Sequence, residues 1–243
     1  MRLLALACLL VVVATAAADP PKKLRVALVS GSVEYQSDES LAAFQKRLEA
    51  GYPVECVRIF RKTDTDLPGL DKLADCDLAI FYTRRLKLDD AQLGHVKKYL
   101  ASGKPVVGLR SASHGFQTWL AMDQEVFGGD YQNHYGAGPR CEVKVSAAHN
   151  DHPVLRQVEG FTSPGSLYKN KGVAADVTVL LTGTTPAATE PVAWVRERTV
   201  GGRKQRVFYT SLGHPDDFKQ PAFQRLLLNA IRWCVKDEKA FAR

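Results

Sequence analysis

Short apolar runs alternate with amphipathic stretches along the first half of the chain. The apolar runs are rich in β-branched residues and predict strands over residues 24–31, 54–60, 77–82 and 105–109. Two intervening stretches carry apolar residues at helical spacing and predict helices, one beginning at Ser37-Asp38 and one over residues 88–100. This alternation is typical of a flavodoxin-like α/β fold, with three layers around an open, mainly parallel sheet.

The second half of the chain is richer in predicted strands. Residues 127–138, FGGDYQNHYGAG, contain too many Gly and Asn residues to continue a helix, and they predict a functional loop. The other expected elements are strands at 141–146 and 177–181, a hairpin that joins 192–200 to 206–210, and a closing helix from Pro221.

The first 18 residues have the composition of a cleaved secretory signal. Arg2 precedes an apolar core over residues 3–13, and the segment ends in Ala16-Ala17-Ala18. The core is too short to span a membrane, and no later stretch approaches about 18 uninterrupted apolar residues. We therefore expect export to the periplasm or the extracellular space without a membrane anchor. Residues 19–243 are expected to form a single domain.

Charge argues against nucleic acid as a partner. The formal net charge is +7, and removal of residues 1–18, which contain one arginine and no acid, makes it +6. Apart from Arg203-Lys204-Gln205-Arg206, the basic residues are scattered, and no basic stripe interleaved with aromatic residues is present. The sequence leaves a homo-oligomer open.

Cysteine usage leaves two alternatives. The cysteines beyond residue 18 are Cys56, Cys76, Cys141 and Cys234. In an oxidising compartment they could form two disulfides by any of three pairings, or they could stay as buried thiols. The absence of a C-x-x-C pair disfavours a cysteine zinc site or a redox motif.

Arg110 stands at the turn after the predicted strand 105–109. In an open α/β sheet this position faces the ligand crevice, near the free N–H groups of the next helix. A guanidinium can bind a carboxylate, a phosphate or sugar hydroxyls, but it cannot act as a nucleophile. The alternative is an internal ion pair of Arg110 with Asp77 or Asp130.

The residues after Arg110 weakly resemble a nucleophile elbow. Ser111-Ala112-Ser113-His114-Gly115 has serine in the first glycine position of G-x-S-x-G. Ser113 is more simply explained as part of a first helical turn, whereas His114 is expected at the site because it follows the strand end closely.

A second predicted strand also ends in polar groups. Residues 206–213 lead to His214, with Asp216 two residues later. A carboxylate can orient a histidine ring and stabilise its cation, as general-base chemistry requires. The alternative is that Asp216 or Asp217 caps the final helix. A turn is also expected at His149-Asn150-Asp151-His152.

The order of these parts resembles the class I glutamine amidotransferase-like fold, in which an elbow cysteine follows one strand and His-Pro-Glu follows a later one. Arg110 takes the place of the cysteine, and His214-Pro215-Asp216 takes the place of His-Pro-Glu. Within that fold the chain is similar to the ThuA-like (trehalose-utilisation) family over residues 24–235. The motifs that carry the similarity are Gly108-Leu109-Arg110-Ser111-Ala112, Gly128-Gly129, Asn133-His134, Asp151-His152-Pro153, Tyr168, Pro191-Val192-Ala193-Trp194 and Val207-Phe208-Tyr209-Thr210-Ser211-Leu212-Gly213-His214.

This resemblance implies a role in carbohydrate metabolism, on trehalose-related or 3-keto sugar derivatives. Many members carry histidine at the elbow, so Arg110 is a departure, and without a nucleophile there the protein should not be a glutaminase. In this hypothesis Arg110 and Asn133 bind sugar oxygens, His214 is the general base or acid, and Asp216 orients it. The remaining expected substrate-binding residues are Ser111, His114, His134 and Tyr168.

Three alternatives stay open beside this hypothesis. No cofactor is predicted, but His114, His134 and His214 could hold zinc or a related divalent metal, with one coordination position open to substrate. A fold that has lost its nucleophile could instead be a carbohydrate-binding or partner-binding module. A serine hydrolase would require His214 within hydrogen-bond distance of Ser111 or Ser113.

Overall fold

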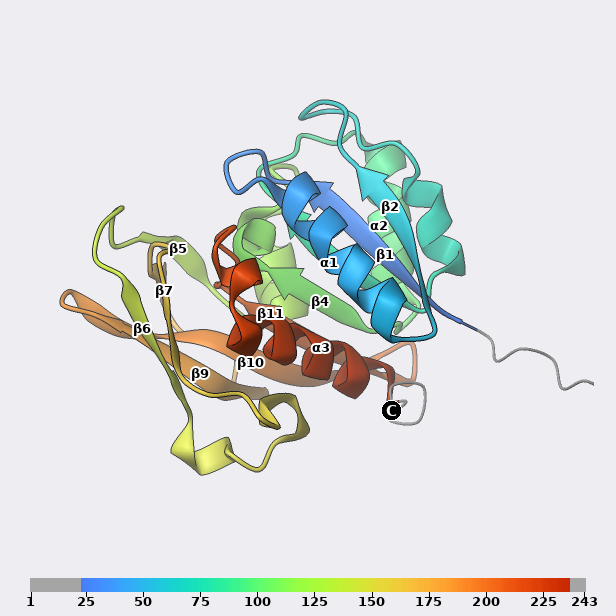
Figure 1. Cartoon of the computed structure of the whole chain (residues 1–243). Coiled ribbons are helices and arrows are strands. Elements are labelled where there is room, and N and C mark those ends of the chain that lie inside the picture. The colour runs from blue at the N-terminus through green and yellow to red at the C-terminus, as the bar shows by residue number, and fades with distance from the viewer. Residues whose placement is uncertain (1–22, 237–243) are drawn as a thin grey trace, which may run out of the picture.

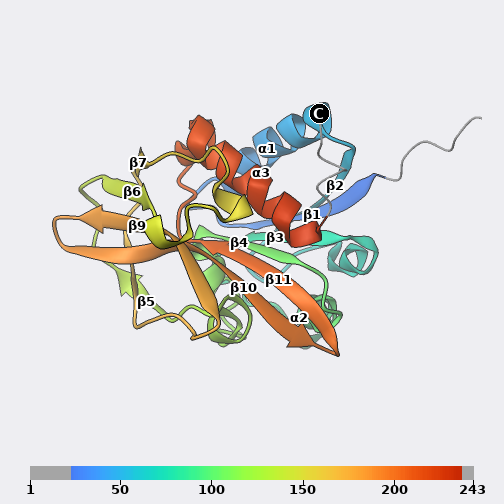
Figure 2. The same ribbon diagram turned by 90° about the horizontal axis from the view of Figure 1, so that it is seen from below.

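The computed structural model describes residues 23–236 as a twisted sheet with helices on both faces (Figures 1 and 2). Helices α1 (Ser37–Gly51) and α3 (Pro221–Val235) cover one face, and α2 (Asp90–Ala101) covers the other. This arrangement confirms the expected α/β architecture with three layers. The signal segment predicted for residues 1–18 lies outside the described residues. Within residues 23–236, no helix combines the length and the apolar character needed to cross a membrane.

Five parallel strands form one half of the main sheet. They are, in spatial order, β2 (Val54–Phe60), β1 (Leu24–Gly31), β3 (Leu78–Thr83), β4 (Val106–Leu109) and β11 (Arg203–Thr210). The sheet continues with antiparallel neighbours, β10 (Ala188–Val200), β9 (Val177–Thr185), β6 (Cys141–Val145) and β7 (Phe161–Ser163). A separate antiparallel pair consists of β5 (Tyr131–His134) and β8 (Tyr168–Asn170). The parallel pairing places the loops after β1, β3, β4 and β11 at one edge of the sheet.

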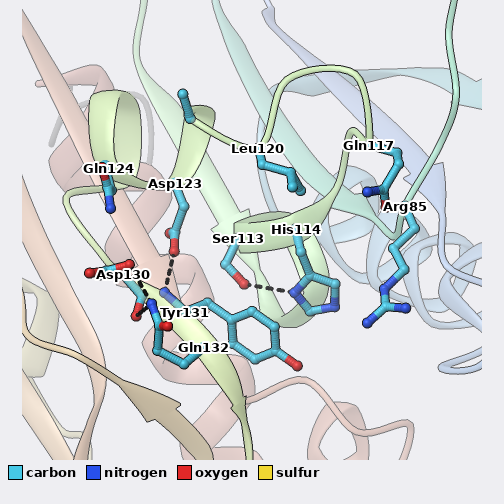
Figure 3. Close-up of a pocket in the computed structure, with 11 residues that line it drawn as sticks. Arg85, Ser113, His114, Gln117, Leu120, Asp123, Gln124, Asp130, Tyr131 and Gln132 are labelled. Carbon is cyan, nitrogen blue, oxygen red and sulfur yellow. Dashed lines mark hydrogen bonds between the residues drawn. The ribbon is translucent and has the colours of Figure 1, made fainter.

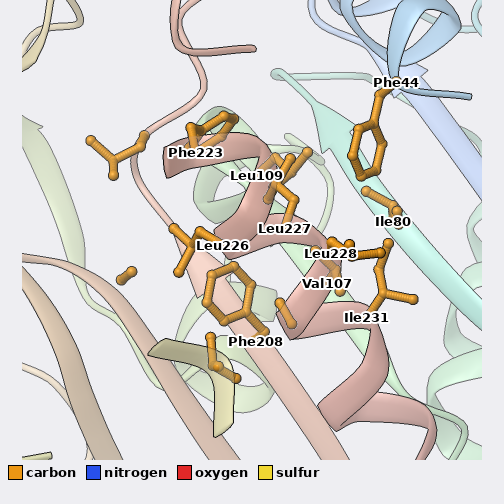
Figure 4. Packing of buried hydrophobic residues seen from close by; sticks show 14 of the residues in the cluster. Phe44, Ile80, Val107, Leu109, Phe208, Phe223, Leu226, Leu227, Leu228 and Ile231 are labelled. Carbon is orange, nitrogen blue, oxygen red and sulfur yellow. The ribbon is translucent and has the colours of Figure 1, made fainter. Parts of the chain in front are cut away.

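Alternation along the strands divides the apolar core between the two faces. Val107 and Leu109 of β4 belong to the cluster that packs with α1 and α3, whereas Val106 belongs to the cluster on the α2 side. Figure 4 shows Phe223 and Ile231 of α3 among the residues that face these strands. Complete burial of a side chain of this size contributes roughly 1.5–3 kcal/mol, so packing against α3 stabilises the strands whose ends carry the site.

Two expectations about the loops need correction. The chain after β4 forms a short 3-10 helix, Arg110–His114, and not the start of an α-helix. The helix cannot continue because Gly115 and Gln117 pair with Leu86: the Leu86 N–H donates to the Gly115 oxygen (2.8 Å), and the Gln117 N–H donates to the Leu86 oxygen (2.7 Å). The expected loop 127–138 also contains the strand β5.

The cysteines Cys56, Cys76, Cys141 and Cys234 are free thiols.

Candidate functional site

Arg110 occupies a strained turn directly after β4. Its φ is 46°, in the left-handed region that costs a non-glycine residue on the order of 1 kcal/mol. The Tyr209 hydroxyl, at the end of β11, donates a hydrogen bond of 2.6 Å to the Arg110 carbonyl oxygen. An added Cβ on Gly165 would lie 2.9 Å from Nη1 of Arg110, so the glycine lets the chain pass close to the guanidinium. The chain therefore has an elbow at this point, without a nucleophile on it.

The Arg110 side chain is 1% exposed and is held by groups of the protein itself. Nη1 donates to the Ser211 oxygen (2.6 Å), and Nη2 donates to Oγ of Ser166 (3.0 Å). The guanidinium carbon also lies 4.4 Å from the ring centroid of Tyr35 and 4.8 Å from that of Tyr168. Two ring faces, a carbonyl oxygen and a hydroxyl oxygen thus stabilise the buried cation.

Asp77 and Asp130, the acids expected to pair with Arg110, bond to other residues. A carboxylate oxygen of Asp77 accepts from the N–H of Arg25 (2.9 Å), and one of Asp130 accepts from the side-chain amide of Gln132 (2.7 Å). The ion-pair alternative is therefore wrong for both aspartates.

A polar pocket of about 490 Å³ lies beyond the carboxyl ends of β3 and β4. Its lining comes from the loop after β3, the 3-10 helix after β4, a turn of π-helix (Asp123–Phe127) and β5. The lining residues with functional side chains include Arg85, Ser113, His114, Asp123, Asp130 and Tyr131 (Figure 3). Of the residues predicted to bind substrate, His114 lines this pocket.

His114 is a neutral imidazole in this pocket. Its ring stacks on Tyr131, with 4.2 Å between the centroids, and its Nδ1 lies 3.1 Å from Oγ of Ser113. Burial, reinforced by the positive charge of Arg85, lowers the pKa of His114 to about 3. The ring can therefore give or accept a hydrogen bond through Nε2, but it is too weakly basic to remove a proton efficiently near neutral pH.

Asp123 is a buried carboxyl with an unusual proton affinity. One oxygen, Oδ2, accepts from the Tyr131 N–H (2.8 Å), while Oδ1 has no hydrogen-bond partner among the described residues. Burial raises the pKa of Asp123 to about 7. An added Cβ on Gly129 would lie 2.8 Å from Oδ1, so the glycine lets the chain pass close to this carboxyl. The hydrogen bond from the Tyr131 N–H to Asp123 holds the start of β5 at the pocket wall.

His214 and Asp216 lie after β11, as expected, but their geometry is weak. Nδ1 of His214 accepts from the Asp216 N–H (3.2 Å) and is 3.7 Å from the Asp216 carboxylate. A neutral ring that accepts through Nδ1 cannot also donate from that atom to a carboxylate. The Asp216 carboxylate is instead bonded to Nζ of Lys219 (2.7 Å), which lowers its pKa.

Asp217 is the carboxylate that shapes the loop after β11. Its Oδ2 accepts from Oγ of Ser163 and from the N–H groups of Gly213 and His214, each at 2.9 Å. Burial raises the pKa of Asp217 despite these bonds. The expectation that Asp216 or Asp217 caps the final helix is wrong, because α3 follows Gln220 and has no side-chain cap.

The other expected site residues divide between the interior and the surface. Ser111 is buried and donates to Oγ of Ser32 (3.1 Å). Tyr168 is buried, with its ring 4.6 Å from that of Tyr131. Asn133 and His134 are exposed on β5, and Nδ1 of His134 accepts from the Gly136 N–H (3.0 Å).

Two smaller expectations can also be compared with the structure. His152 forms the expected turn, because its Nδ1 accepts from the Val154 N–H (3.2 Å) at the start of a 3-10 helix. Across residues 23–236, no group of three or more His, Cys, Asp or Glu side chains is arranged to hold a metal ion.

Arg85, Gln117, Asp123 and Gln132 line the pocket but are not among the site residues predicted from the sequence. Arg85 carried a usable signal, since it is the second residue after β3, and the carboxyl ends of parallel strands share an edge. Gln117 lies on a loop, Asp123 on the π-helix and Gln132 on β5. The path of the chain into these segments follows the pairing of Leu86 with the segment around Gly115, which no local pattern reveals.

Comparison with known proteins places this geometry in a family. The family model for ThuA, trehalose utilisation, matches residues 25–234. A search of curated proteins finds no match. Among solved structures, a ThuA-like protein from Bacteroides uniformis ATCC 8492 is 20% identical, with a TM-score of 0.68 over 93% of this chain and 96% of the other. A ThuA-like protein from Parabacteroides merdae ATCC 43184 is 13% identical, with a TM-score of 0.66 over 88% and 90%.

The wider fold is that of the amidotransferases. A glutamine amidotransferase from Thermotoga maritima is 9% identical, with a TM-score of 0.51 over 88% of this chain and 99% of the other. At such identities the structural matches establish the fold, while the family model covers nearly all of the described residues. This chain belongs to the ThuA (trehalose utilisation) family, on a class I glutamine amidotransferase-like fold.

Proposed function

We propose that this protein acts on a small carbohydrate, a trehalose-related or 3-keto sugar derivative, in the pocket around His114 and Tyr131. The observation that supports this most is the pocket lining, which combines a guanidinium, an imidazole, hydroxyls, amides and carboxylates around about 490 Å³. That volume lies in the range of about 300–1,000 Å³ typical of small-molecule sites. Many polar groups with few apolar ones suit a ligand covered in hydroxyls.

The chemistry we propose is acid–base and does not use a cysteine nucleophile. A 3-keto sugar has an acidified C–H beside its carbonyl, so one base and one group that stabilises the carbonyl oxygen suffice for elimination, hydration or isomerisation. Asp130 is a half-buried carboxylate that lines the pocket and can take the base role, while Asp123 holds or releases a proton near neutral pH. The described cysteines cannot replace them, because Arg110 stands at the elbow.

Arg110 and His214 take supporting roles in this proposal. The Arg110 guanidinium lies against the ring of Tyr168, which in turn packs on Tyr131, so Arg110 supports the back of the pocket. His214 is bonded within its own loop, to the Asp216 N–H. The catalytic roles first predicted for Arg110, His214 and Asp216 thus pass to residues of the pocket lining.

The experiment combines turnover and binding. Purified protein is incubated with 3-keto-trehalose, 3-keto-glucosides and trehalose, in metal-free buffer and with added zinc, and calorimetry measures binding in parallel. We expect Asp130→Asn to abolish conversion and to retain binding. Asp64→Asn, an exposed carboxylate paired with Arg61, is the matched control and should behave as the wild type.

Each outcome separates the alternatives. Binding without conversion under every metal condition supports a binding module. No binding of any of these sugars contradicts the proposal.

We also propose export, from the composition of residues 1–18. Expression of the full chain in a Gram-negative host, followed by cell fractionation and N-terminal sequencing, tests this. A mature protein in the periplasm that begins near Asp19 is expected, whereas an intact N-terminus in the cytoplasm would contradict it.

A further inference from the structure

Three of the polar groups at one end of the pocket, beside Gln117, are without a hydrogen-bond or ion-pair partner among residues 23–236. They are the Arg85 guanidinium, Nε2 of His114 and the Tyr131 hydroxyl, and together they are called the Arg85 corner here. Figure 3 shows the three side chains at one end of the pocket, with Asp130 at the other. Arg85 is also the charged residue that most affects the pKa values of both His114 and Tyr131, as expected for near neighbours.

The backbone of Arg85 is strained and is fixed to the turn that carries His114. Its φ is 51°, which a non-glycine residue adopts at an energetic cost. Its N–H donates to the His114 oxygen at 2.9 Å, and the following N–H, of Leu86, donates to the Gly115 oxygen at 2.8 Å. Strained residues of this kind persist where the surrounding structure holds them, often at ligand sites. The backbone segments that carry the guanidinium and the imidazole are therefore tied to each other.

The charge of Arg85 is uncompensated, unlike that of its neighbour. Arg84 pairs with the Glu34 carboxylate at 2.7 Å. Arg85 is exposed and has no such partner within residues 23–236, while the pocket carboxylates Asp123 and Asp130 lie toward the opposite end in Figure 3. The pocket thus has a basic end and an acidic end.

The hydrogen bonds behind His114 let the ring present either tautomer. The Tyr209 hydroxyl gives its proton to the Arg110 oxygen, so it can still accept from Ser113. The Ser113 hydroxyl has one proton and two acceptors within reach, Tyr209 and Nδ1 of His114. When Ser113 donates to Nδ1, Nε2 of the neutral ring carries a hydrogen and becomes a donor to the pocket.

We propose that the Arg85 corner binds the carboxylate of an acidic sugar, such as a uronic acid. This inference rests on the proposed function for the carbohydrate nature of the ligand, and it adds the charged group. The Arg85 fork matches a planar carboxylate, and Tyr131 and His114 supply two neutral donors beside it. The sugar hydroxyls would then donate to Asp130 at the acidic end, so the polarity of the pocket orients the ligand.

Calorimetry with D-glucuronate, D-glucose and D-glucose 6-phosphate tests the corner. Charge-assisted hydrogen bonds predict that glucuronate binds at least about tenfold more tightly than glucose. Arg85→Gln should remove this preference, so that glucuronate and glucose bind with similar affinity. Arg84→Gln is the matched control, an adjacent arginine outside the pocket lining, and should keep the preference. On binding of glucuronate, the His114 imidazole should show the Nε2–H tautomer in ¹⁵N NMR spectra.

Folding is checked separately, because Arg85 is strained. Arg85→Gly relieves the left-handed backbone, so its Tm should not fall although the glucuronate preference is lost. Gln157→Gly, at another left-handed position (φ 56°) outside this pocket, should keep the preference.

The outcomes distinguish this inference from the proposed function. Equal affinity for glucuronate and glucose overturns the carboxylate subsite while leaving the carbohydrate function intact, and tighter binding of glucose 6-phosphate also overturns it. Failure of all neutral and acidic sugars to bind overturns both.

Discussion

The hydroxyl of Tyr209 donates a hydrogen bond of 2.6 Å to the backbone oxygen of Arg110. Tyr209 lies one residue before the end of β11 and Arg110 follows the parallel neighbour β4, so this bond ties two strand ends together beneath the pocket. Tyr209 is 2% exposed, and water therefore has little access to replace the bond. The left-handed turn held by this bond places Ser113 and His114 at the pocket wall, which links the fold directly to the proposed site.

Tyr209→Phe should lower the free energy of unfolding by about 1–3 kcal/mol, because it leaves the buried Arg110 oxygen without a donor. Chemical denaturation measures the loss. Tyr99→Phe is a matched control, since the Tyr99 hydroxyl donates to the Pro105 oxygen at 2.7 Å, at the opposite end of β4 from Arg110. Both variants should lose stability, but only Tyr209→Phe should alter sugar binding.

Arg110→Met should destabilise the protein by about 2–4 kcal/mol, since it removes a buried cation from two tyrosine rings and leaves the Ser211 oxygen without its donor. Thermal and chemical unfolding provide the measurement. A variant as stable as the wild type would show that Arg110 is kept for contact with a ligand and not for structure.

The stability of the protein should depend on pH through Asp123. Its pKa of about 7 in the folded state lies above its ordinary value of 3.8, so between these values the folded chain holds a proton that the unfolded chain has released. The free energy of unfolding should therefore fall as pH rises through this window, by at most ~1.4 kcal/mol per pH unit, and level off above about pH 7. Asp123→Asn, which mimics the protonated acid, should remove this contribution. Denaturation curves of both proteins from pH 5 to 8 that keep a constant difference would contradict the assignment.

His114 should remain neutral from pH 8 down to about pH 4. Burial and the arginines around the ring lower its pKa to about 3, so its imidazole signals should not move over this range. A pH titration followed by ¹³C and ¹⁵N NMR is the measurement, and His114→Phe, which keeps the stack on Tyr131, identifies the signal. A midpoint between pH 6 and 7 would mean that the ring is open to water.

Much of the fold could be predicted because its signals are local. The β-branched run 24–31 and the helical spacing of Leu41, Phe44 and Leu48 predict elements that the structure contains as β1 and α1. The carboxyl-edge rule also placed Arg110, His114 and His214 on loops at one edge of the sheet. These predictions need the order of elements and no side-chain geometry.

The pocket could be predicted only in part, because its residues are set by contacts between distant segments. Asp123 depends on the path of residues 115–131, which follows from the pairing of Leu86 with the Gly115 region. The inward course of the Arg110 side chain depends on Tyr35 and Tyr168, which lie 75 and 58 positions away in the sequence. Short patterns carry no information on such contacts, so a strand-end arginine that binds a ligand and one that supports the wall look alike in the sequence.

A crystal structure of the protein with a bound 3-keto or acidic sugar tests the central claim most directly. The sugar is expected in the pocket between Arg85 and Asp130, in contact with His114, with the Arg110 guanidinium still on Ser211 and Tyr168. A sugar held by His214 and Asp216, with nothing between Arg85 and Asp130, would contradict it.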